Sequence, residues 1–385
     1  MAEGTGRRHR GATTGREEGV PVNTSTELRI GVVGCGYWGS KHVRVLHSLF
    51  DVDQVVVIDP REDRISSLVR SFPGARGFET LTAALPYVDA VVIATPPTTH
   101  VPLALAAIAA GKHVLVEKPL ATTAADARRL VNAAAHAGVR LMVGHTFEHN
   151  SAVHKLRELV RGGELGELYN IDTARLNLGL YQSDVNVIFD LAPHDVSIVN
   201  YVLGCSPESV QAWGACHVHR RLQDVAYLRL FYPQLTMSAN IHVSWLDPCK
   251  VRRLTIVGSR KMALYDDLDV DERIRIYDKG VTPPADDQDL TQPPMSYRYG
   301  DITVPYLDFE EPLVVQDRSF ADCIRTGKRP SVDGENGLAV VEVLECLQIS
   351  LQEGRRVQLA EVAAGARSLN GSANHTDELL VESLL

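Results

Sequence analysis

Apolar residues in the first half of the chain alternate between two periods. Short runs rich in β-branched residues suit strands buried on both faces, and each leads into a segment with the apolar spacing of an amphipathic helix. We expect strands over 28–33, 54–58, 90–94, 113–116 and 139–143, and helices over 37–50, 101–110 and 123–137. Strands and helices that alternate through short links form a parallel sheet with right-handed crossovers. The pattern predicts an α/β domain over residues 28–146.

The pattern changes after about residue 146. Apolar and polar positions then alternate along segments with hairpin-like links, which is typical of an open antiparallel sheet with one polar face. We expect strands over 168–178, 209–219, 225–231, 235–243, 252–257, 261–265 and 273–277, helices over 151–161, 186–203, 314–325 and 336–353, and a long loop over 278–306. Residues 147–360 are therefore predicted to form an α+β domain that carries a predominantly antiparallel sheet.

The two ends of the chain lack such patterns. Residues 1–27 are rich in Gly, Thr and Arg and have no apolar core of a secretory signal, and Glu17 and Glu18 argue against a transit peptide. We expect a disordered leader there and a flexible tail over 361–385. The last residues of the tail, Leu-Leu-Val-Glu-Ser-Leu-Leu, suit either a loose amphipathic segment or a docking segment.

Composition narrows the class of protein. The 385 residues suffice for two cores, the net charge of −9 gives a nucleic-acid partner no general electrostatic support, and no apolar run is long enough to cross a membrane. Six scattered cysteines without a C-x-x-C pair favour a reduced, cytoplasmic protein. His217 and His219 share one strand face without a third ligand, so we expect no metal site.

A glycine cluster follows the first predicted strand. Gly34 allows a tight turn, Gly36 lets a pyrophosphate approach the backbone, and Gly39 lets the next helix pack close to the strand. Such a cluster alone is weak support for a nucleotide site. Tyr37 and Trp38 lie inside the turn and are candidate cofactor contacts, although core packing would explain Trp38 equally well.

Asp59 ends the second predicted strand, twenty residues after Gly39. A dinucleotide-binding unit places there the acid that binds the ribose hydroxyls of adenosine. An aspartate would repel a 2′-phosphate, so NAD is favoured over NADP, while the nearby Arg61 and Arg64 keep NADP open. The alternative is a plain turn residue before Pro60.

Other polar residues follow the remaining strands of the first domain. Because the carboxyl ends of parallel strands meet at one edge, ligands gather there. Further candidate cofactor contacts at this edge are Thr95, Pro96, Pro97, His100, Glu117, Lys118 and His145. Most lysines are solvated surface charges, but the position of Lys118 predicts that it points into the cleft beside the nicotinamide.

Asp190 and His194 are four residues apart in a predicted helix, and therefore lie on one face. His194 could act as a general base while Asp190 orients it or binds a sugar hydroxyl. The alternative is a helix-capping aspartate beside an ordinary exposed histidine.

These motifs occur in the order typical of one enzyme family. The glycine turn, Glu117-Lys118-Pro119 and Asp190-x-x-x-His194 resemble the glucose–fructose oxidoreductase/inositol dehydrogenase (Gfo/Idh/MocA) family over residues 28–359. The resemblance implies an N-terminal Rossmann domain and a C-terminal open sheet that builds homodimers or homotetramers.

The resemblance also implies site roles. Lys118 would bridge substrate and nicotinamide, His194 would accept the proton, Asp190 would assist it or contact the sugar, and residues 94–100 would line the nicotinamide ribose.

Residues 175–190 look like family members that oxidise carbon 3 of nucleotide sugars, such as UDP-glucose or a UDP-N-acetylglucosamine derivative. The chain departs from many members at 187–189, where Val-Ile-Phe replaces a glycine pair. Candidate substrate contacts are Arg175, Asn177 and Asn186, and Lys250 and Arg252 are further cations that either grip a diphosphate or are solvated.

The sequence therefore predicts an NAD-dependent sugar dehydrogenase. One alternative is an NAD(P)H-dependent reductase of a keto sugar or cyclic imine, and another is a non-catalytic NAD-binding regulator. Among the remaining residues, His42, His47 and His136 fit helix surfaces, and Trp245 and Tyr297 are candidate pocket walls.

Overall fold

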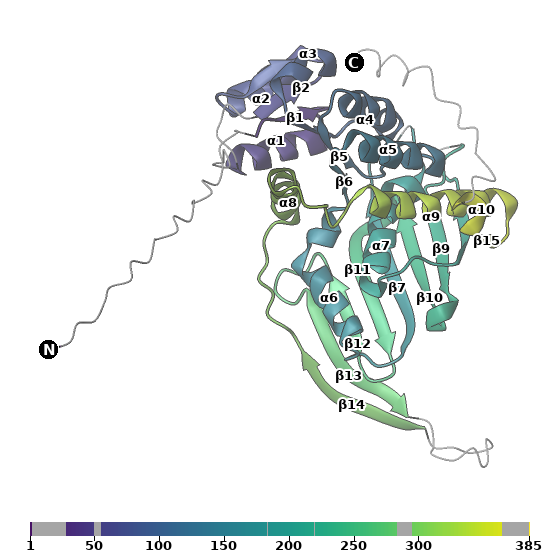
Figure 1. The fold of residues 1–385 in the computed structure, drawn as a ribbon. Helices are drawn as coiled ribbons and strands as arrows, with labels where there is room; N and C mark the ends of the chain where they lie inside the picture. Colours follow the sequence, from purple (N-terminus) through teal and green to yellow (C-terminus); the bar gives the residue numbers. More distant parts are fainter. Residues whose placement is uncertain (2–27, 50–54, 183, 219, 283–294, 364–384) are drawn as a thin grey trace.

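The computed structural model describes residues 1, 28–49, 55–182, 184–218, 220–282, 295–363 and 385. Nearly all of the predicted leader and of the predicted tail lies outside these residues. Two sheets organise the chain, a small one near the N-terminus and a large one that follows it (Figure 1).

The first sheet has six parallel strands in the order β3-β2-β1-β4-β5-β6. They are β1 (Ile30–Val33), β2 (Val55–Ile58), β3 (Arg76–Phe78), β4 (Ala90–Ile93), β5 (His113–Glu117) and β6 (Leu141–Gly144). The predicted parallel sheet is confirmed. Only β3 was not expected, because it is a three-residue edge strand with two exposed residues and has no apolar run.

Helices cover this sheet. They are α1 (Tyr37–Leu49), α2 (Glu62–Ser71), α3 (Leu81–Ala84), α4 (His100–Ala109) and α5 (Ala124–Ala137), with 3₁₀ turns η2 (Leu85–Tyr87), η3 (Pro97–Thr99) and η4 (Thr146–His149). The strand order reverses beside β1, which pairs with β2 on one side and β4 on the other. A crevice at such a switch point is where open α/β sheets bind ligands.

The second sheet has nine strands in the order β14-β13-β12-β11-β7-β10-β9-β8-β15. They are β7 (Leu168–Leu178), β8 (Ser209–Ala215), β9 (Val225–Tyr232), β10 (Met237–Ser244), β11 (Leu246–Gly258), β12 (Met262–Asp266), β13 (Ile274–Thr282), β14 (Ser296–Thr303) and β15 (Val357–Gln358). All neighbours are antiparallel except β7 and β10. The predicted open, mainly antiparallel sheet is confirmed.

The prediction of one long loop over 278–306 is wrong at both ends. Strand β13 continues to Thr282, and residues 296–303 return as β14 beside it. The loop was predicted because the segment is rich in Pro and Asp. The aromatic and β-branched residues at its end favour a strand, and the prediction gave them too little weight.

Helices from the second domain serve two purposes. α6 (Ser151–Arg161), α7 (Val187–Leu203) and α9 (Gly334–Glu353) lie on one side of the large sheet, and α10 (Ala360–Ala363) follows them (Figure 1); the short η5 (Pro233–Leu235) links β9 to β10. α8 (Pro312–Thr326) instead packs against α1, and its Phe320 enters the core of the first domain. Within the described part of the chain, no helix has both the length and the apolar character needed to cross a bilayer.

Candidate active site

The glycine turn has the shape of a phosphate cradle. Gly34 has a φ of +86°, and a Cβ on Gly39 would lie 1.9 Å from the carbonyl oxygen of Gly34. The first turn of α1 therefore packs directly on the turn after β1, as only glycine permits. A Cβ on Gly36 would meet nothing nearer than an Arg64 nitrogen at 3.8 Å, so this side stays open. The residues fit a dinucleotide pyrophosphate.

A cavity of about 930 Å³ extends from this turn to the large sheet. Sequence-predicted residues that line it are Gly34, Gly36, Tyr37, Trp38, Asp59, Thr95, Pro96, Pro97, Glu117, Lys118, Asn177 and Asp190. Lys250, Arg252 and Trp245 line it as well. Trp38 is 39% exposed, so the core-packing alternative for this residue is wrong.

Asp59 lies at the end of β2 with its carboxylate turned toward the glycine turn. It accepts hydrogen bonds from the backbone N–H groups of Cys35 (2.7 Å) and Arg61 (3.0 Å). The guanidinium of Arg64 contacts the same carboxylate at 3.1 Å. Arg64 thus offsets part of the charge with which Asp59 would repel a 2′-phosphate.

Asp59→Asn is expected to raise the ratio of kcat/KM for NADP to that for NAD by at least about tenfold. The amide still accepts the N–H of Cys35 but no longer repels a phosphate, and a charge–charge term of this kind is worth on the order of 1 kcal/mol or more. Steady-state kinetics with both cofactors measure the ratio. Asp63→Asn, an exposed neighbour, is the matched control, and an unchanged ratio in Asp59→Asn would refute the ribose role.

The Lys118 ammonium connects the two domains. Its Nζ donates to the backbone oxygen of Asp190 at 2.7 Å and to Asp190 Oδ1 at 3.1 Å. The other carboxylate oxygen, Oδ2, accepts the indole N–H of Trp245 at 2.9 Å. The cation that follows β5, a carboxylate of α7 and the tryptophan between β10 and β11 thus meet on one wall of the cavity.

The cap of α7 is Asn186 and not Asp190. The Asn186 side-chain oxygen accepts the N–H groups of Ile188 and Phe189, and its Nδ2 donates to Gln223 and Gln348 at 3.0 and 2.8 Å. Asn186 is buried and does not line the cavity. Asn186 was predicted to contact the substrate, but in the structure its side chain caps the start of α7. The Asp190 carboxylate is therefore not needed as the helix cap.

Arg175 is also a support residue. It is buried, its Nε lies 2.7 Å from Asp195 Oδ2, and its guanidinium lies over the Phe147 ring at 4.7 Å. Burial acts to lower the pKa of Arg175, but the charge of Asp195 outweighs burial and raises it. Arg175 was predicted to contact the substrate, but it does not line the cavity. Side chains alternate between the two faces of a strand, and on β7 Arg175 lies on the face that packs toward α7.

His194 lies one helical turn beyond Asp190, beside the residues that line the cavity. The ring packs edge-on against Phe147, with 5.2 Å between centroids, and among the described residues its buried Nδ1 has no hydrogen-bond partner. Burial and then the charge of Lys118 and Arg175 hold its pKa well below the usual 6.5. The imidazole is therefore neutral near pH 7, as a general base must be.

Two other predicted cofactor contacts lie behind the cavity wall. His100 is fully buried, and its ring nitrogens contact the carbonyl oxygens of Pro119 (2.8 Å) and Thr95 (2.9 Å), so it joins two loops and does not reach a ligand. His145 is 1% exposed and, within the described residues, neither ring nitrogen has a partner. Burial lowers the pKa of His145 to about 4.

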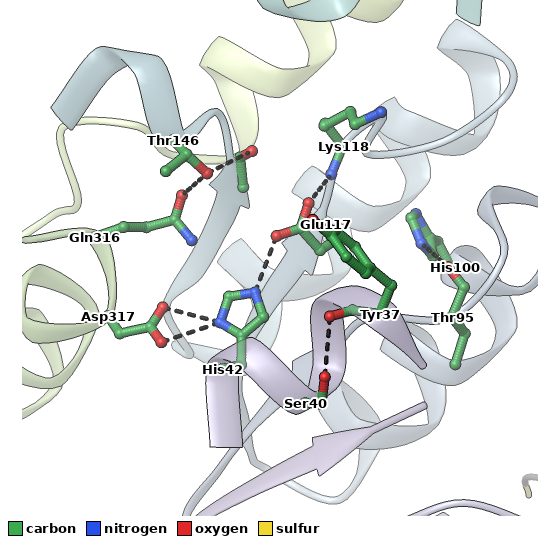
Figure 2. A network of polar contacts seen from close by, with 11 residues as sticks. Tyr37, Ser40, His42, Thr95, His100, Glu117, Lys118, Thr146, Gln316 and Asp317 are labelled. Atoms are coloured by element: carbon green, nitrogen blue, oxygen red, sulfur yellow. Dashed lines mark hydrogen bonds and ion pairs between the residues drawn. The ribbon is translucent and has the colours of Figure 1, made fainter. Parts of the chain in front are cut away.

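Some features were missed or misjudged in the sequence. His42 is not on a helix surface but fully buried, in contact with Glu117 and Asp317 (Figure 2). Its spacing from Leu46 and Leu49 on α1 was the available signal. Tyr297 is an exposed residue of β14, outside the cavity lining.

No metal site is found in the part of the chain that the structure describes, where His217 instead contacts Asp224 at 2.7 Å. Leu180, Gln182 and Asp184, from the segment after β7, also line the cavity; the sequence had pointed to residues 175–190 as a segment but not to these three side chains.

Comparisons with known proteins agree with this architecture. Residues 28–145 match the model of the oxidoreductase family with an NAD-binding Rossmann fold, and residues 153–264 match the GFO/IDH/MocA C-terminal domain. The myo-inositol 2-dehydrogenase of Thermotoga maritima is 25% identical over 87% of this chain and 99% of that protein. The UDP-N-acetylglucosamine 3-dehydrogenase of Acidithiobacillus ferrooxidans is 29% identical over 66% of this chain and 78% of that protein.

A solved structure extends the comparison. GenD2 from gentamicin A biosynthesis, determined in complex with NAD, is 26% identical, with a TM-score of 0.72 over 87% of this chain and 97% of that chain. Both family models lie in the expected order, and together they cover more than half of the chain. The chain belongs to the Gfo/Idh/MocA family of oxidoreductases and is an NAD(P)-dependent dehydrogenase that acts on CH–OH groups.

Proposed function

We propose that this dehydrogenase uses NAD to oxidise carbon 3 of a nucleotide sugar, such as UDP-glucose or a UDP-N-acetylglucosamine derivative, to a ketone. The observation that carries the proposal is the contact of Lys118 with Asp190 on the wall of the cavity that also holds the glycine turn. Asp59 at the end of β2 supports NAD over NADP.

The chemistry divides among three side chains. When bound, NAD supplies the acceptor for the hydride of the sugar carbon. Lys118 donates a charge-assisted hydrogen bond to the substrate oxygen and stabilises the negative charge that develops there. His194 takes the hydroxyl proton, and Asp190, held by Trp245, accepts a hydrogen bond from a sugar hydroxyl.

Two cations support a nucleotide-linked substrate. Lys250 and Arg252 of β11 line the cavity, and Lys250 is exposed there. Arg252 keeps one carboxylate partner, Asp267 at 3.1 Å, while offering further N–H groups. The 29% identity to a UDP-N-acetylglucosamine 3-dehydrogenase agrees with a diphosphate contact, whereas the myo-inositol 2-dehydrogenase makes a free polyol the second candidate.

A substrate screen tests the proposal. Purified protein is incubated with NAD or NADP and with UDP-glucose, UDP-N-acetylglucosamine, its uronate, free glucose or myo-inositol, and the absorbance of the reduced cofactor is followed. We expect reduction of NAD with at least one nucleotide sugar. Reduction with myo-inositol and with none of the nucleotide sugars would overturn the substrate assignment and leave the dehydrogenase assignment intact.

The same screen has a variant arm. In Lys250→Ala we expect KM for the nucleotide sugar to rise by about tenfold with little change in kcat. The variant loses one charged hydrogen bond to the phosphate, and it loses this bond in the ground state and the transition state alike. The exposed Lys328→Ala is its control. Equal KM values in all three proteins would remove Lys250 from the substrate site.

We also propose a homodimer or homotetramer built through the open face of the large sheet. Trp213 and Tyr227 are exposed there, and the Tyr227 ring stacks on His242 with 4.1 Å between centroids. An exposed aromatic patch of this kind suits a protein interface. Light scattering measures the mass in solution, and a monomer at micromolar concentration would contradict the proposal.

A further inference from the structure

Three buried side chains behind Lys118 take no part in the chemistry proposed above. They are His42 on α1, Glu117 at the end of β5 and Asp317 on α8 (Figure 2). His42 Nε2 lies 2.9 Å from Glu117 Oε1, and His42 Nδ1 lies 3.0 Å from each carboxylate oxygen of Asp317. His42 and Asp317 are fully buried, and Glu117 is 6% exposed.

The geometry requires a charged imidazole if both contacts are to be hydrogen bonds to carboxylates. A neutral imidazole has one N–H, so only the imidazolium donates from both ring nitrogens at once. Burial acts to lower the pKa of His42, but Asp317 and Glu117 outweigh burial and raise it to about 10. Burial also raises the pKa of Asp317, against the pull of His42.

Glu117 stays ionised beside this cation. Burial acts to raise its pKa, but the hydrogen bond and charge of His42, followed by the charge of Lys118, lower it overall. The charged groups that face His42 are thus Glu117 from β5 and Asp317 from α8, with Lys118 beyond Glu117. Gln316, the other α8 side chain in the network, is neutral and contacts Thr146 at 2.9 Å.

The second oxygen of Glu117 leads to the active site. Oε2 accepts the backbone N–H of Lys118 at 3.2 Å, and the Lys118 ammonium in turn contacts Asp190 on the cavity wall. Gly144 on the neighbouring strand leaves room for this carboxylate, since a Cβ there would lie 2.9 Å from it. The orientation of the Glu117 carboxylate therefore helps to fix the position of the Lys118 backbone, from which the ammonium side chain extends.

We propose that His42 is a positioning residue of the dehydrogenase. Held by Asp317 on α8, it fixes the Glu117 carboxylate and through it the Lys118 backbone, so that the ammonium meets the substrate oxygen. The inference rests on the proposed role of Lys118. This role differs from a purely structural one. If the contact between α1 and α8 only stabilised the fold, its loss would not change the rate of the step that depends on Lys118.

The first test compares kcat with cofactor affinity. We expect His42→Gln and Asp317→Asn to lower kcat by about 10- to 100-fold, as displacement of a reacting group by about 1 Å does, while Kd for NAD stays within about threefold. His136→Gln, an exposed histidine near the end of α5, is the control. Circular dichroism shows whether each variant is folded at the assay temperature. Unchanged kcat in both folded variants would overturn the inference.

A double-mutant cycle separates positioning from stability. In a Lys118→Ala background, measured in single turnovers over hours, His42→Gln is expected to cost less than about threefold, because no ammonium remains to be positioned. The same 10- to 100-fold loss in both backgrounds would show that His42 acts independently of Lys118. If Lys118→Ala itself retains turnover, the proposed function fails; if only His42→Gln retains it, this inference alone fails.

A measurement on the unmutated protein covers the case in which the variants do not fold. Nitrogen-15 NMR of labelled histidines is expected to show one imidazole protonated on both nitrogens at pH 8 that loses its proton only near pH 10. Since its pKa in the folded state is raised from 6.5, the stabilisation from His42 is complete below about pH 6.5 and is lost as pH rises through 10. Absence of any doubly protonated histidine at pH 8 would overturn the inference.

Discussion

Lys118→Ala is expected to lower kcat by about 10²–10³-fold, the usual cost of removing one donor to a developing oxyanion. The loss should be confined to turnover because the ammonium contacts Asp190 of α7, whereas the glycine turn and Asp59 are the residues proposed to bind the other end of the dinucleotide. Kd for NAD should change by less than about threefold. Stopped-flow measurement of hydride transfer and fluorescence titration with NAD give the two quantities.

The control for Lys118→Ala is the exposed Lys328→Ala, which should match the original protein in both measurements. Lys118→Arg adds a second comparison, since it keeps the charge but changes the shape of the donor. A Lys118→Ala protein that turned over at near the original rate would refute the proposed mechanism.

Replacement of His194 by alanine is expected to lower kcat/KM by about 10²–10⁴-fold, the range for loss of a general base. Burial and the charge of Lys118 hold the pKa of His194 well below 6.5, so the base is unprotonated through the neutral range. In the original protein, kcat/KM should therefore stay level as pH falls from 8 to below 6.5. It should decline only in more acidic buffer, where His194 gains a proton.

The pH–rate profile with and without His194 checks this assignment. In His194→Ala the acidic limb that belongs to this residue should disappear, whereas the exposed His136→Gln should keep the original profile. An unchanged rate in His194→Ala, or an acidic limb already centred at pH 6.5 in the original protein, would assign the base to another group.

Strands were predictable from the sequence where a run of apolar residues is buried on both faces of the sheet, and the α7 helix where polar residues are spaced four apart. β2 and β4 are fully buried, so their β-branched runs identified them, and Asp190 and His194 share a helix as their spacing indicated. β3 and β14 escaped prediction because edge strands with exposed residues need no apolar pattern. Their existence depends on pairing with β2 and β13, which local sequence does not encode.

Only some residues of the candidate site could be predicted, because their tertiary partners are not visible in the sequence. Residue type and the carboxyl end of a strand pointed to Asp59 and Lys118, which line the cavity. The resemblance of residues 175–190 to nucleotide-sugar dehydrogenases pointed to Arg175 and Asn186, but their polar groups are taken up by Asp195 and by the start of α7. A sequence shows that a polar group exists, but the partner that satisfies it is set by packing.

His42 marks the boundary between the two kinds of information. The glycine turn, the acid after β2 and the lysine after β5 follow from local backbone requirements and strand order, so the sequence alone determined a dinucleotide-binding domain and pointed to its proposed reactive lysine. The contact of His42 with Asp317 joins residues 275 positions apart, and it exists only because α8 leaves the second domain and packs on α1. The tertiary structure alone decided which histidine is buried between carboxylates, because burial and charge pairing are properties of the assembled core.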